Sequence, residues 1–481
     1  MSSTRDRKVQ EPSTPGRPVR LSFDHGTLRL DGAGEGEADA VRETGPWLWD
    51  ARIGAFRCDA IHYAEVWGAL AERFADRFTD EVAPPKRVKW GKVSLPSLRR
   101  EQQGALDAWL AAGGRGQVIM PTGTGKTEIA LAAMRHTSIA TLVVAPVRDL
   151  MYQWHRRILR GLGYDAGILG DSRHNVRPVT VTTYDSAYIH MADLGDRFGL
   201  VAFDEEHHLP GRCRREAALF CAAAMRLGLT ATPERSDGLH ADLDSLIGPV
   251  VYVQKVSAAK GRTLADYDVV RIPVALTDDE QARYEELGRI VRSFIASRRK
   301  DQEGYDWQTL CAESGKDPEA RQAQRAYYAK KSIEDRAAEK LRVLEDLFRL
   351  HAGERVIVFA GSNAMAMDVS RRFLVPTLLS HSRKRERLVA LEGFGGGTFP
   401  VLVANRVLDE GVDVPAAKVA IVIGGQASTR QAKQRLGRIL RRTGEARATL
   451  YEVVCEDTNE EARSRRRRRS DAYERTRHRR L

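Results

Sequence analysis

Short apolar runs alternate with helical stretches over most of the chain. Between residues 115 and 230 these runs are 117–120, 141–145, 179–182, 200–203 and 226–229. Each is followed by polar residues. Buried strands of a parallel sheet have this nearly continuous apolar character, because crossover helices cover both faces. The pattern predicts an α/β domain over residues 95–256, with functional side chains at the carboxyl ends of its strands.

A second pattern of the same kind begins near residue 354. Its apolar runs are 355–360, 401–404, 419–423 and 449–454. They predict a second parallel-sheet domain over residues 351–458. Two such domains agree with the two or three domains expected of a chain of 481 residues.

The stretch between the two sheets, residues 277–350, has helical periodicity. Apolar residues recur at helical spacing from Tyr284 to Ile295, and a second long helix is predicted from about Pro318 to Leu350. Neither helix fits a doubly wound sheet, so the stretch is interpreted as a helical bridge or protrusion. Its basic residues either contact a phosphate backbone or form a solvated face, and the sequence favours neither alternative.

The first part of the chain predicts a small α+β domain over residues 19–90. Apolar and polar residues alternate on both sides of 24–26, which is typical of a hairpin, and 62–78 has helical character. Aromatic bulk is supplied by Trp47, Trp49, Phe56 and Tyr63. These side chains either fill the core of the small domain, which is the favoured interpretation, or stack on bases.

Both ends of the chain are polar. Residues 1–18 are rich in Ser, Pro and Arg, and residues 463–481 contain an unbroken arginine run at 465–469. Both segments are predicted to be disordered, and the basic tail is expected to add salt-sensitive affinity for nucleic acid. The net charge of +12 agrees with a polyanionic partner, although much of the excess lies in this tail.

Composition argues against two further classes of protein. No apolar run reaches membrane-spanning length, and no export signal is recognised. The five cysteines are odd in number and scattered, without metal-ligand spacing. These features predict reduced thiols in a cytoplasmic, nucleoid-associated protein with no membrane partner.

Residues 121–127 read Pro-Thr-Gly-Thr-Gly-Lys-Thr, between a predicted strand and a predicted helix. A phosphate-binding loop requires this position, because its glycines let backbone N–H groups point at a phosphate and the helix adds its positive dipole end. Lys126 can reach the β- and γ-phosphates, and Thr127 can bind Mg²⁺. A chance lysine in a glycine-rich turn is the alternative, and the strand–loop–helix context argues against it.

An acidic stretch, Asp204-Glu205-Glu206-His207, follows the run 200–203. Asp204 can hold Mg²⁺, and Glu205 can orient or deprotonate an attacking water. Standing alone, such a stretch would be a solvated turn, but the phosphate loop upstream favours the catalytic interpretation. Residues 228–233 end a further strand with small hydroxyl residues, which can link a nucleotide site to whatever binds across the domain.

Arginines recur where residues 434–441 open a predicted helix in the second domain. Arg435, Arg438 and Arg441 are three residues apart, so they share one helix face. Such a row is a nucleic-acid surface or a phosphate clamp. Because the phosphate loop brings no arginine finger of its own, the second domain is expected to supply one, worth roughly 10³–10⁵ in rate.

Taken in chain order, these motifs resemble those of the superfamily 2 DEAD/DEAH-box helicases, and within them the XPB-like DNA helicases. The motifs are 98–102, 121–127, 145–148 with Trp154, 182–184, 204–207, 229–233, 358–360, 409–413 and 434–441. The resemblance covers about residues 95–455. The first 90 residues also resemble the small damage-recognition-type domain of that branch.

The resemblance implies two RecA-like domains with ATP and Mg²⁺ in the cleft between them, a thumb-like insertion at 277–350, and a nucleic-acid strand crossing both domains. It implies that adenine is read by Arg99 and Gln102. Phosphates and Mg²⁺ would be held by Thr122, Gly123, Thr124, Gly125, Lys126 and Thr127 with Asp204, and water would be activated by Glu205. From the second domain, Gln434 would face the γ-phosphate, and Arg438 and Arg441 would be the arginine fingers. Gly411 and Asp413 would couple the ATP-binding cleft to the nucleic-acid strand. The nucleic-acid backbone would be held by Pro146, Arg148 and Thr183.

The function implied is an ATP-dependent DNA helicase or translocase that moves 3′ to 5′, with DNA repair as a fitting role and a nuclease or repair protein as the expected partner. Three alternatives remain open: a duplex translocase that does not separate strands, an ATP-gated DNA-binding switch in defence or recombination, and an RNA helicase. The Arg-Glu-Asp element of XPB-like proteins is not matched by 234–237, which lowers the expected power to open a duplex.

Overall fold

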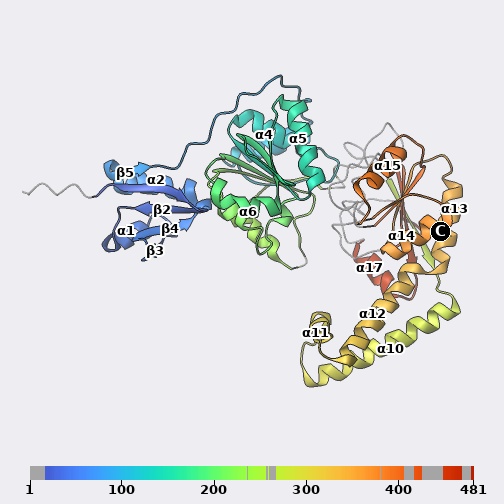
Figure 1. Ribbon diagram of the computed structural model, residues 1–481. Helices are drawn as coiled ribbons and strands as arrows, with labels where there is room; N and C mark the ends of the chain where they lie inside the picture. The colour runs from blue at the N-terminus through green and yellow to red at the C-terminus, as the bar shows by residue number, and fades with distance from the viewer. Residues whose placement is uncertain are drawn as a thin grey trace, which may run out of the picture. The chain divides into compact units, whose positions relative to one another are not determined.

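The computed structural model of the protein describes residues 17–235, 237–255, 258, 267–379, 381–405, 417–424, 448–467 and 478–480 (Figure 1). The chain divides into two compact units. The first comprises Met1–Val118, Glu128–Leu229 and Arg235–Val251, and the second comprises Ile119–Thr127, Thr230–Glu234 and Tyr252–Leu481.

The N-terminal domain is a five-stranded sheet in the order β3-β4-β2-β1-β5. Its strands are β1 (Val19–Asp24), β2 (Thr27–Asp31), β3 (Leu48–Asp50), β4 (Ala55–Asp59) and β5 (Phe78–Asp80), and its helices are α1 (Ala38–Arg42) and α2 (Tyr63–Phe74). Val66, Leu70 and Phe74 of α2 pack into a core completed by inward-facing residues of the sheet. The predicted hairpin is confirmed, because β1 and β2 pair antiparallel.

The four aromatic residues named in the sequence belong to the core cluster or pack against it, as predicted, with Trp49 and Tyr63 only partly buried, whereas Trp67 is 47% exposed. Trp47 and Phe56 are buried. Trp49 contacts Phe56 edge to face, with ring centroids 4.8 Å apart. Strands β3, β4 and β5 were not predicted, because they are short and their polarity does not alternate clearly.

An eight-stranded sheet follows, in the order β13-β6-β12-β11-β7-β10-β8-β9. Its strands are β6 (Arg115–Ile119), β7 (Thr141–Ala145), β8 (Gly167–Gly170), β9 (Arg173–Asn175), β10 (Val179–Thr183), β11 (Leu200–Asp204), β12 (Met225–Thr230) and β13 (Val250–Val253). From β12 to β8 the neighbouring strands pair in parallel, and β9 is antiparallel to β8. Each predicted apolar run of this domain lies on a strand, so the prediction of a parallel sheet is confirmed.

Helices cover this sheet on both faces. They are α3 (Arg100–Ala111), α4 (Lys126–Thr137), α5 (Arg148–Leu162), α6 (Tyr184–Leu194), α7 (Glu216–Leu219) and α8 (Leu243–Leu246). Helices α6, α7 and α8 share one core cluster with Leu142, Val144 and Phe203 of the sheet. Helices α4 and α5 lie on the other side (Figure 1). Because both faces are covered, the strands appear in the sequence as continuous apolar runs.

The second unit contains a seven-stranded sheet in the order β16-β17-β15-β18-β19-β14-β20, whose neighbouring strands pair in parallel. Its strands are β14 (Tyr267–Val274), β15 (Val356–Phe359), β16 (Thr377–Leu378), β17 (Val401–Ala404), β18 (Val419–Val422), β19 (Ala448–Cys455) and β20 (His478–Arg480). The four predicted runs lie on β15, β17, β18 and β19. Strand β14 was missed, because it precedes the helical stretch and most of the second unit separates it from its partner β19.

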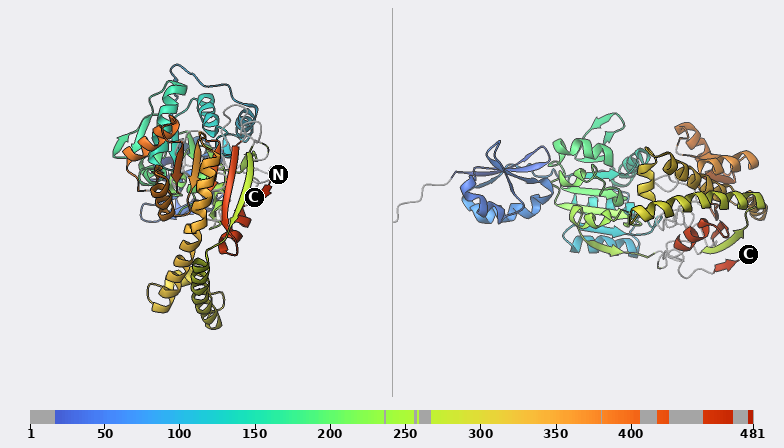
Figure 2. Two further views of the ribbon diagram at one scale, coloured as in Figure 1. Left: turned by 90° about the vertical axis from the view of Figure 1, so that its right-hand side faces the viewer. Right: turned by 90° about the horizontal axis from the view of Figure 1, so that it is seen from below.

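The helices of the second unit are α10 (Asp278–Asp301), α11 (Trp307–Glu313), α12 (Pro318–Arg336), α13 (Ala338–Leu350), α14 (Asn363–Phe373), α15 (Lys384–Gly395) and α17 (Asn459–Arg467). Helices α10 and α12 pack side by side, and α11 packs against α12 (Figures 1 and 2). We call α10, α11 and α12 the helical protrusion.

The structure corrects the prediction of one helix from Pro318 to Leu350. Helix α12 ends at Arg336, and the extended ψ of 131° at the buried Ala337 separates it from α13. Leu344 and Leu347 of α13 pack into the core of the second sheet. Alanine favours helices, so only tertiary packing, which the sequence pattern does not reveal, could locate this break.

The prediction of a disordered tail from Arg463 is wrong at its beginning. Residues 459–467 form α17, in which Ser464 is fully buried and Arg463 forms an ion pair with the buried Glu334. Further along, β20 pairs with β14. The arginine-rich composition concealed these elements, because Glu334, which pairs with Arg463, and β14, which pairs with β20, lie far away in the sequence.

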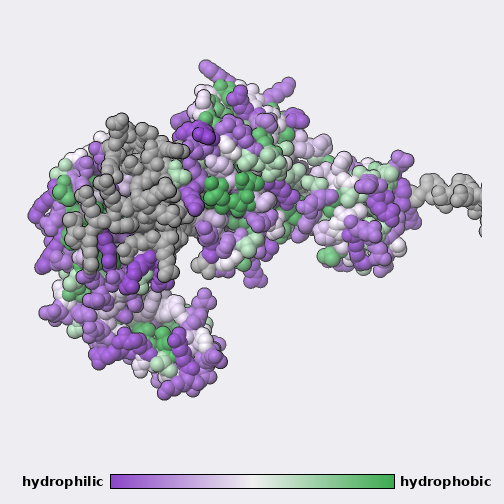
Figure 3. Space-filling view, turned by 180° about the vertical axis from the view of Figure 1, so that it is seen from behind, coloured by the Kyte–Doolittle hydropathy of each residue, from purple (hydrophilic) through white to green (hydrophobic). Residues whose placement is uncertain are grey.

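The surface seen in Figure 3 is largely hydrophilic, and its hydrophobic residues form small separate groups. Within the part of the chain that the structure describes, no helix is both long and apolar enough to cross a membrane.

Candidate phosphate-binding site

The predicted phosphate loop lies between β6 and α4, and its backbone has the required turn. Gly123 and Gly125 have φ angles of 85° and 79°, which side-chain-bearing residues rarely adopt. The hydroxyl and the N–H of Thr124 both donate to the Pro121 carbonyl, at 2.7 and 3.3 Å. Helix α4 begins at Lys126, so its first N–H groups lack helical acceptors and can bind an anion.

Two side chains of the loop have polar groups suited to phosphate oxygens. Lys126 is 9% exposed, and its ammonium donates to the carbonyl of Met120 at 3.0 Å. The Thr122 hydroxyl is buried without a hydrogen-bond partner among the described residues. Buried polar groups are normally paired, so an unpaired hydroxyl beside a glycine-rich loop fits a ligand that brings oxygen atoms.

Neighbouring strand ends bring further polar groups to the same edge of the sheet. The Met120 N–H donates to the Thr230 carbonyl at 2.9 Å, and Asp204 pairs with Leu229 in the parallel register of β11 and β12. The Thr232 hydroxyl is buried and has no hydrogen-bond partner in the described part of the chain. Because carboxyl ends of adjacent parallel strands share an edge, Asp204 and Leu229 lie at one edge, and the bond from Met120 ties the residue before the loop to Thr230, which follows Leu229.

Asp204 is held by two aromatic donors. Its Oδ2 accepts from Nε1 of Trp154 at 2.8 Å, and its backbone carbonyl accepts from the Tyr184 hydroxyl at 2.9 Å. Burial, together with nearby acidic side chains, raises the pKa of Tyr184 far above its ordinary value, so the hydroxyl keeps its proton. The carboxylate therefore has a fixed orientation, as a metal ligand needs.

Glu205 has a strained backbone. Its φ of 50° lies in the left-handed region, which is uncommon for a glutamate. Its Oε2 is 3.5 Å from Nδ1 of His207, whose side chain is fully buried. Strain of this kind persists where the surrounding structure imposes it, and it occurs preferentially at functional sites. Local geometry thus agrees with the predicted importance of Glu205.

Glu206 and Gly228 were not singled out in the sequence. Glu206 is fully buried, and a Cβ atom at position 228 would lie 1.6 Å from its Oε2. Only glycine therefore fits beside this carboxylate. A glycine inside the apolar run of β12 was the available signal, because such a glycine often marks a close approach of another group.

The residues expected to read adenine lie at the start of α3. The Arg99 N–H donates to Oε1 of Gln102 at 2.9 Å, and Gln102 is 3% exposed. This contact caps the helix and fixes both residues. Their role toward a base stays a prediction.

The candidate nucleic-acid contacts lie at the ends of two adjacent strands. Pro146 is buried and follows β7, whose last residue, Ala145, pairs with Thr183 of β10. Thr183 caps α6 by accepting from the Ser186 N–H at 3.3 Å. Arg148 is 72% exposed and forms an ion pair of 2.9 Å with Asp171. The structure thus brings the three candidates to one edge, and their contact with nucleic acid stays a prediction.

Several predicted residues lie outside the described part of the chain. They are Gly411, Asp413, Gln434, Arg435, Arg438 and Arg441. Their roles, including that of the arginine fingers, stay predictions.

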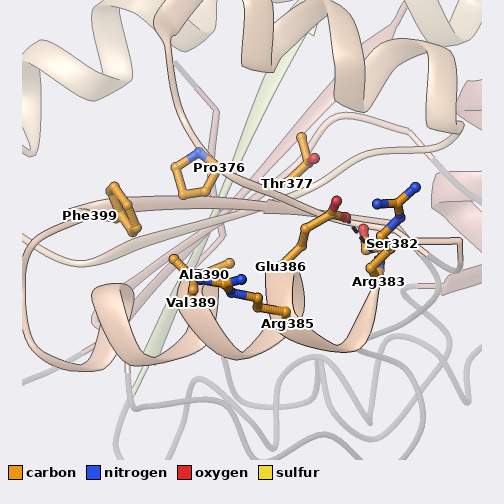
Figure 4. Close-up of a pocket in the computed structure, with 9 residues that line it drawn as sticks. All are labelled: Pro376, Thr377, Ser382, Arg383, Arg385, Glu386, Val389, Ala390 and Phe399. Atoms are coloured by element: carbon orange, nitrogen blue, oxygen red, sulfur yellow. Dashed lines mark hydrogen bonds between the residues drawn. The ribbon is translucent and has the colours of Figure 1, made fainter.

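The second sheet bears a pocket that the sequence did not indicate. It has a volume of about 490 Å³ and lies between β16 and α15 (Figure 4). It is lined by Pro376, Thr377, Ser382, Arg383, Arg385, Glu386, Val389, Ala390 and Phe399. The Arg383 N–H donates to Glu386 at 3.0 Å, which caps α15. The basic run at 383–387 was the available signal.

Three family models match successive parts of the chain. They are the Xeroderma pigmentosum group B helicase damage recognition domain at residues 21–82, the Type III restriction enzyme, res subunit at 95–235, and the ERCC3/RAD25/XPB C-terminal helicase at 321–471. The DNA 3'-5' translocase XPB2 of Sulfurisphaera tokodaii is 41% identical over 422 residues, which make up 87% of this chain and 95% of that protein. The chain belongs to the XPB family of superfamily 2 helicases.

Other similar proteins agree with this membership of the XPB family. The DNA 3'-5' helicase XPB of Kineococcus radiotolerans is 32% identical over 380 residues, covering 76% of this chain and 61% of that protein. The solved structure of S. cerevisiae Dbp5 bound to RNA and ADP BeF3 aligns with a TM-score of 0.55 at 16% identity, over 79% of this chain and 89% of that one. At such low identity the likeness shows the fold alone, which confirms the prediction of RecA-like domains.

Proposed function

We propose that this XPB-family protein is an ATP-driven motor that moves 3′ to 5′ on DNA and separates strands at forks. The carrying observation is the 41% identity to a DNA 3'-5' translocase over 95% of its length. The phosphate loop supports the same proposal, because the positive φ angles of its two glycines and its buried, unpaired hydroxyl suit a nucleotide. DNA repair is a role that fits this activity.

Residues of the first sheet would bind the triphosphate of ATP. Backbone N–H groups of the loop would hold the phosphates, with Lys126 leaving the Met120 carbonyl to contact the β- and γ-phosphates. Thr127 and Asp204 would hold Mg²⁺, which when bound neutralises charge that develops on the transferred phosphate. Because Trp154 fixes Asp204, its carboxylate needs little reorganisation on binding.

Glu205 would orient and deprotonate the attacking water. The nearby His207 side chain and the left-handed backbone restrict the positions its carboxylate can take. In the second domain, Gln434, Arg438 and Arg441 would contact the γ-phosphate, and Gly411 and Asp413 would connect that contact to the DNA strand. Arg99 and Gln102 would read adenine from the first domain.

DNA would be held mainly through its backbone, so sequence specificity should be low. Pro146, Arg148 and Thr183 lie at adjacent strand ends and are the candidate contacts. Arg148 would exchange Asp171 for a phosphate, and such a surface ion pair costs little to break.

A strand-displacement assay tests the direction of movement. Duplexes with a single-stranded tail of either polarity are incubated with the protein, ATP and Mg²⁺, and release of a labelled strand is measured. A 3′ tail should support release and a 5′ tail should not. Equal release from both tails, or release only from the 5′-tailed duplex, would contradict the proposed direction.

A second candidate function is translocation on duplex DNA without strand separation. It is favoured by the contacts of Arg235, whose guanidinium donates to Asp237 at 2.6 Å and to the His207 carbonyl at 2.6 Å. An arginine with two such partners is poorly placed to act on a base pair. ATP hydrolysis stimulated by blunt duplex, with no displacement from either tailed substrate, would favour this candidate.

A further inference from the structure

A cluster of charged and polar residues is buried where the helical protrusion meets the second sheet. Its members are Tyr284 of α10, Glu334 and Asp335 of α12, Lys340 of α13, and Glu460 and Arg463 of α17. We call these six residues the charged junction. Lys340 and Glu460 are fully buried, and Glu334 is 1% exposed. Ionised side chains are seldom buried to this degree unless they are paired, so their contacts need a physical account.

Lys340 is at the centre of the charged junction. Its Nζ donates to Oε2 of Glu460 at 2.7 Å, to the carbonyl of Glu334 at 2.6 Å and to the carbonyl of Ile423 at 3.2 Å. An ammonium has three donors, so all of them are used. Burial, the largest single influence, would lower the pKa of Lys340, but the charge and hydrogen bond of Glu460, together with the nearby Cys455 and Asp335, outweigh it and raise the pKa. The lysine therefore stays charged.

The carboxylates of the junction connect the remaining elements. Glu334 accepts from the Tyr284 hydroxyl at 2.6 Å and from Arg463 of α17. The Asn459 N–H donates to the Tyr284 oxygen at 2.9 Å. Oε2 of Glu460 also accepts from the Cys455 N–H, at the end of β19. Both long helices of the protrusion are thus bonded to groups that hold the ends of β18 and β19.

Asp335 lies against the carboxyl end of β18. Its Oδ1 is buried and has no hydrogen bond among the described residues. A Cβ atom on Gly424 would lie 3.0 Å from that oxygen and 3.2 Å from the backbone of Gly361, which follows β15. Gly424 therefore lies close both to the Asp335 carboxylate and to Gly361.

We propose that Lys340 is a positioning residue that couples the helical protrusion to the end of β18. Ile423, whose carbonyl it holds, directly precedes Gly424 and lies upstream of residues 434–441, for which contacts to the γ-phosphate are proposed. The same ammonium holds the end of α12, so the proposal requires that bound DNA shifts the protrusion and that this shift acts on the strand end. The inference rests on the proposed function, because it concerns how DNA accelerates ATP hydrolysis.

A purely structural role for the junction predicts a different result. In that case, loss of Lys340 would lower stability, and whatever protein stays folded would hydrolyse ATP normally. Stability and coupling must therefore be measured separately. The double variant Lys340→Met/Glu460→Gln serves this purpose, because it removes both charges of the buried pair, and Gln at 460 can still accept from the Cys455 N–H.

The experiment measures kcat and KM for ATP in the full chain, with and without single-stranded DNA. Thermal unfolding and DNA affinity are measured on the same preparations. The matched control is Arg342→Met, on the same helix, whose side chain is 72% exposed. We expect the double variant to lose at least tenfold in DNA-stimulated kcat, with the unstimulated rate within threefold, KM within twofold and DNA affinity within threefold of wild type. The control should match wild type.

A folded double variant whose stimulated kcat is within twofold of wild type would overturn the proposal. Should that variant fail to fold, Tyr284→Phe decides, because it removes one hydroxyl that links α10 to Glu334 and Asn459. A threefold or larger loss of stimulation is expected there, and unchanged stimulation would overturn the inference. A wild-type chain without ATPase activity would instead reject the proposed function, so the two failures are distinguishable.

Discussion

Two buried lysines of this XPB-family protein have opposite surroundings. In the described part of the chain, the ammonium of Lys126 makes one hydrogen bond, to the Met120 carbonyl. Lys340 is fully buried, and its ammonium contacts a carboxylate and two carbonyls. The first lysine lies in a loop with an unpaired hydroxyl, and the second lies where four helices and two strand ends meet.

The difference shows how the same residue type has a binding role in one place and a structural role in another. A cation that is to bind phosphate must be held by a partner that it can leave at little cost, and one carbonyl meets this need. A cation that joins elements must be fully paired, because an unpaired buried charge is very unfavourable. The number of charged partners, more than burial alone, distinguishes the two roles.

Lys126→Ala should give the largest effect on activity and almost none on stability. We expect ATP turnover to fall by about a thousandfold or more, because the side chain is proposed to contact the phosphates, as electrostatic groups of this kind are worth about 10²–10³ or more in rate. The free energy of unfolding should change by less than about 1 kcal/mol, since one hydrogen bond is lost. Turnover and urea unfolding curves test both parts, and hydrolysis at the wild-type rate would reject the site.

Lys340→Met should have the converse effects, a large loss of stability and little change in ATP binding. Removing this cation leaves Glu460 buried with an uncompensated charge, so we expect the free energy of unfolding to fall by about 3–5 kcal/mol. ATP binding by the protein that remains folded should be close to that of wild type. Urea unfolding and nucleotide titration give the two values. A variant as stable as wild type would show that the buried pair of Lys340 and Glu460 does not contribute to stability in this way.

Gly228→Ala should lower both stability and ATP turnover, and each effect should be smaller than the main effect of the two lysine substitutions. The added Cβ would lie 1.6 Å from Oε2 of Glu206, so the acidic stretch must move. Overpacking of this kind costs about 1–3 kcal/mol, and displacement of Asp204 and Glu205 should slow ATP turnover. Gly211→Ala is the matched control, because no atom lies within 3.4 Å of a Cβ there. Equal turnover in both variants would contradict the close packing described for Glu206.

Asp335→Asn should have the smallest effect, and a pH-dependent one. Burial raises the pKa of Asp335 above its ordinary 3.8, although the Lys340 charge opposes this. The folded state thus binds this proton more tightly than the unfolded state, so ionised Asp335 lowers stability at pH above its folded pKa. Asn removes that cost. The free energy of unfolding of the variant should exceed that of wild type at pH 8, and the difference should shrink as the pH falls toward 4. A difference that stays constant over this pH range would contradict the prediction.

The sequence predicted most of the fold because buried parallel strands leave a simple pattern. Every apolar run assigned to the two sheets lies on a strand, and the loop at 121–127 has the predicted turn. The misses share one cause, which is dependence on distant partners. Strand β14, the break at Ala337 and the packing of Arg463 are each determined by contacts with segments far away in the sequence.

The candidate site divides in the same way. Lys126 and Asp204 could be found because motifs place them at strand ends, where chemistry is expected. The importance of Gly228 could not be judged without its contact to Glu206. Trp154 could not be recognised as a partner of Asp204 from spacing alone. The charged junction was invisible for a further reason: its lysine, glutamates and arginine lie on helices whose exposed faces have the same composition.

ATP hydrolysis by the full chain, with and without DNA, tests the central claim most directly. Wild type and Glu205→Gln are compared at saturating ATP and Mg²⁺, with single-stranded, duplex and forked DNA and with RNA. The account predicts hydrolysis that DNA stimulates in wild type, and a loss of turnover with retained ATP binding in Glu205→Gln. Hydrolysis that DNA does not change, or an equal rate in Glu205→Gln, would contradict it.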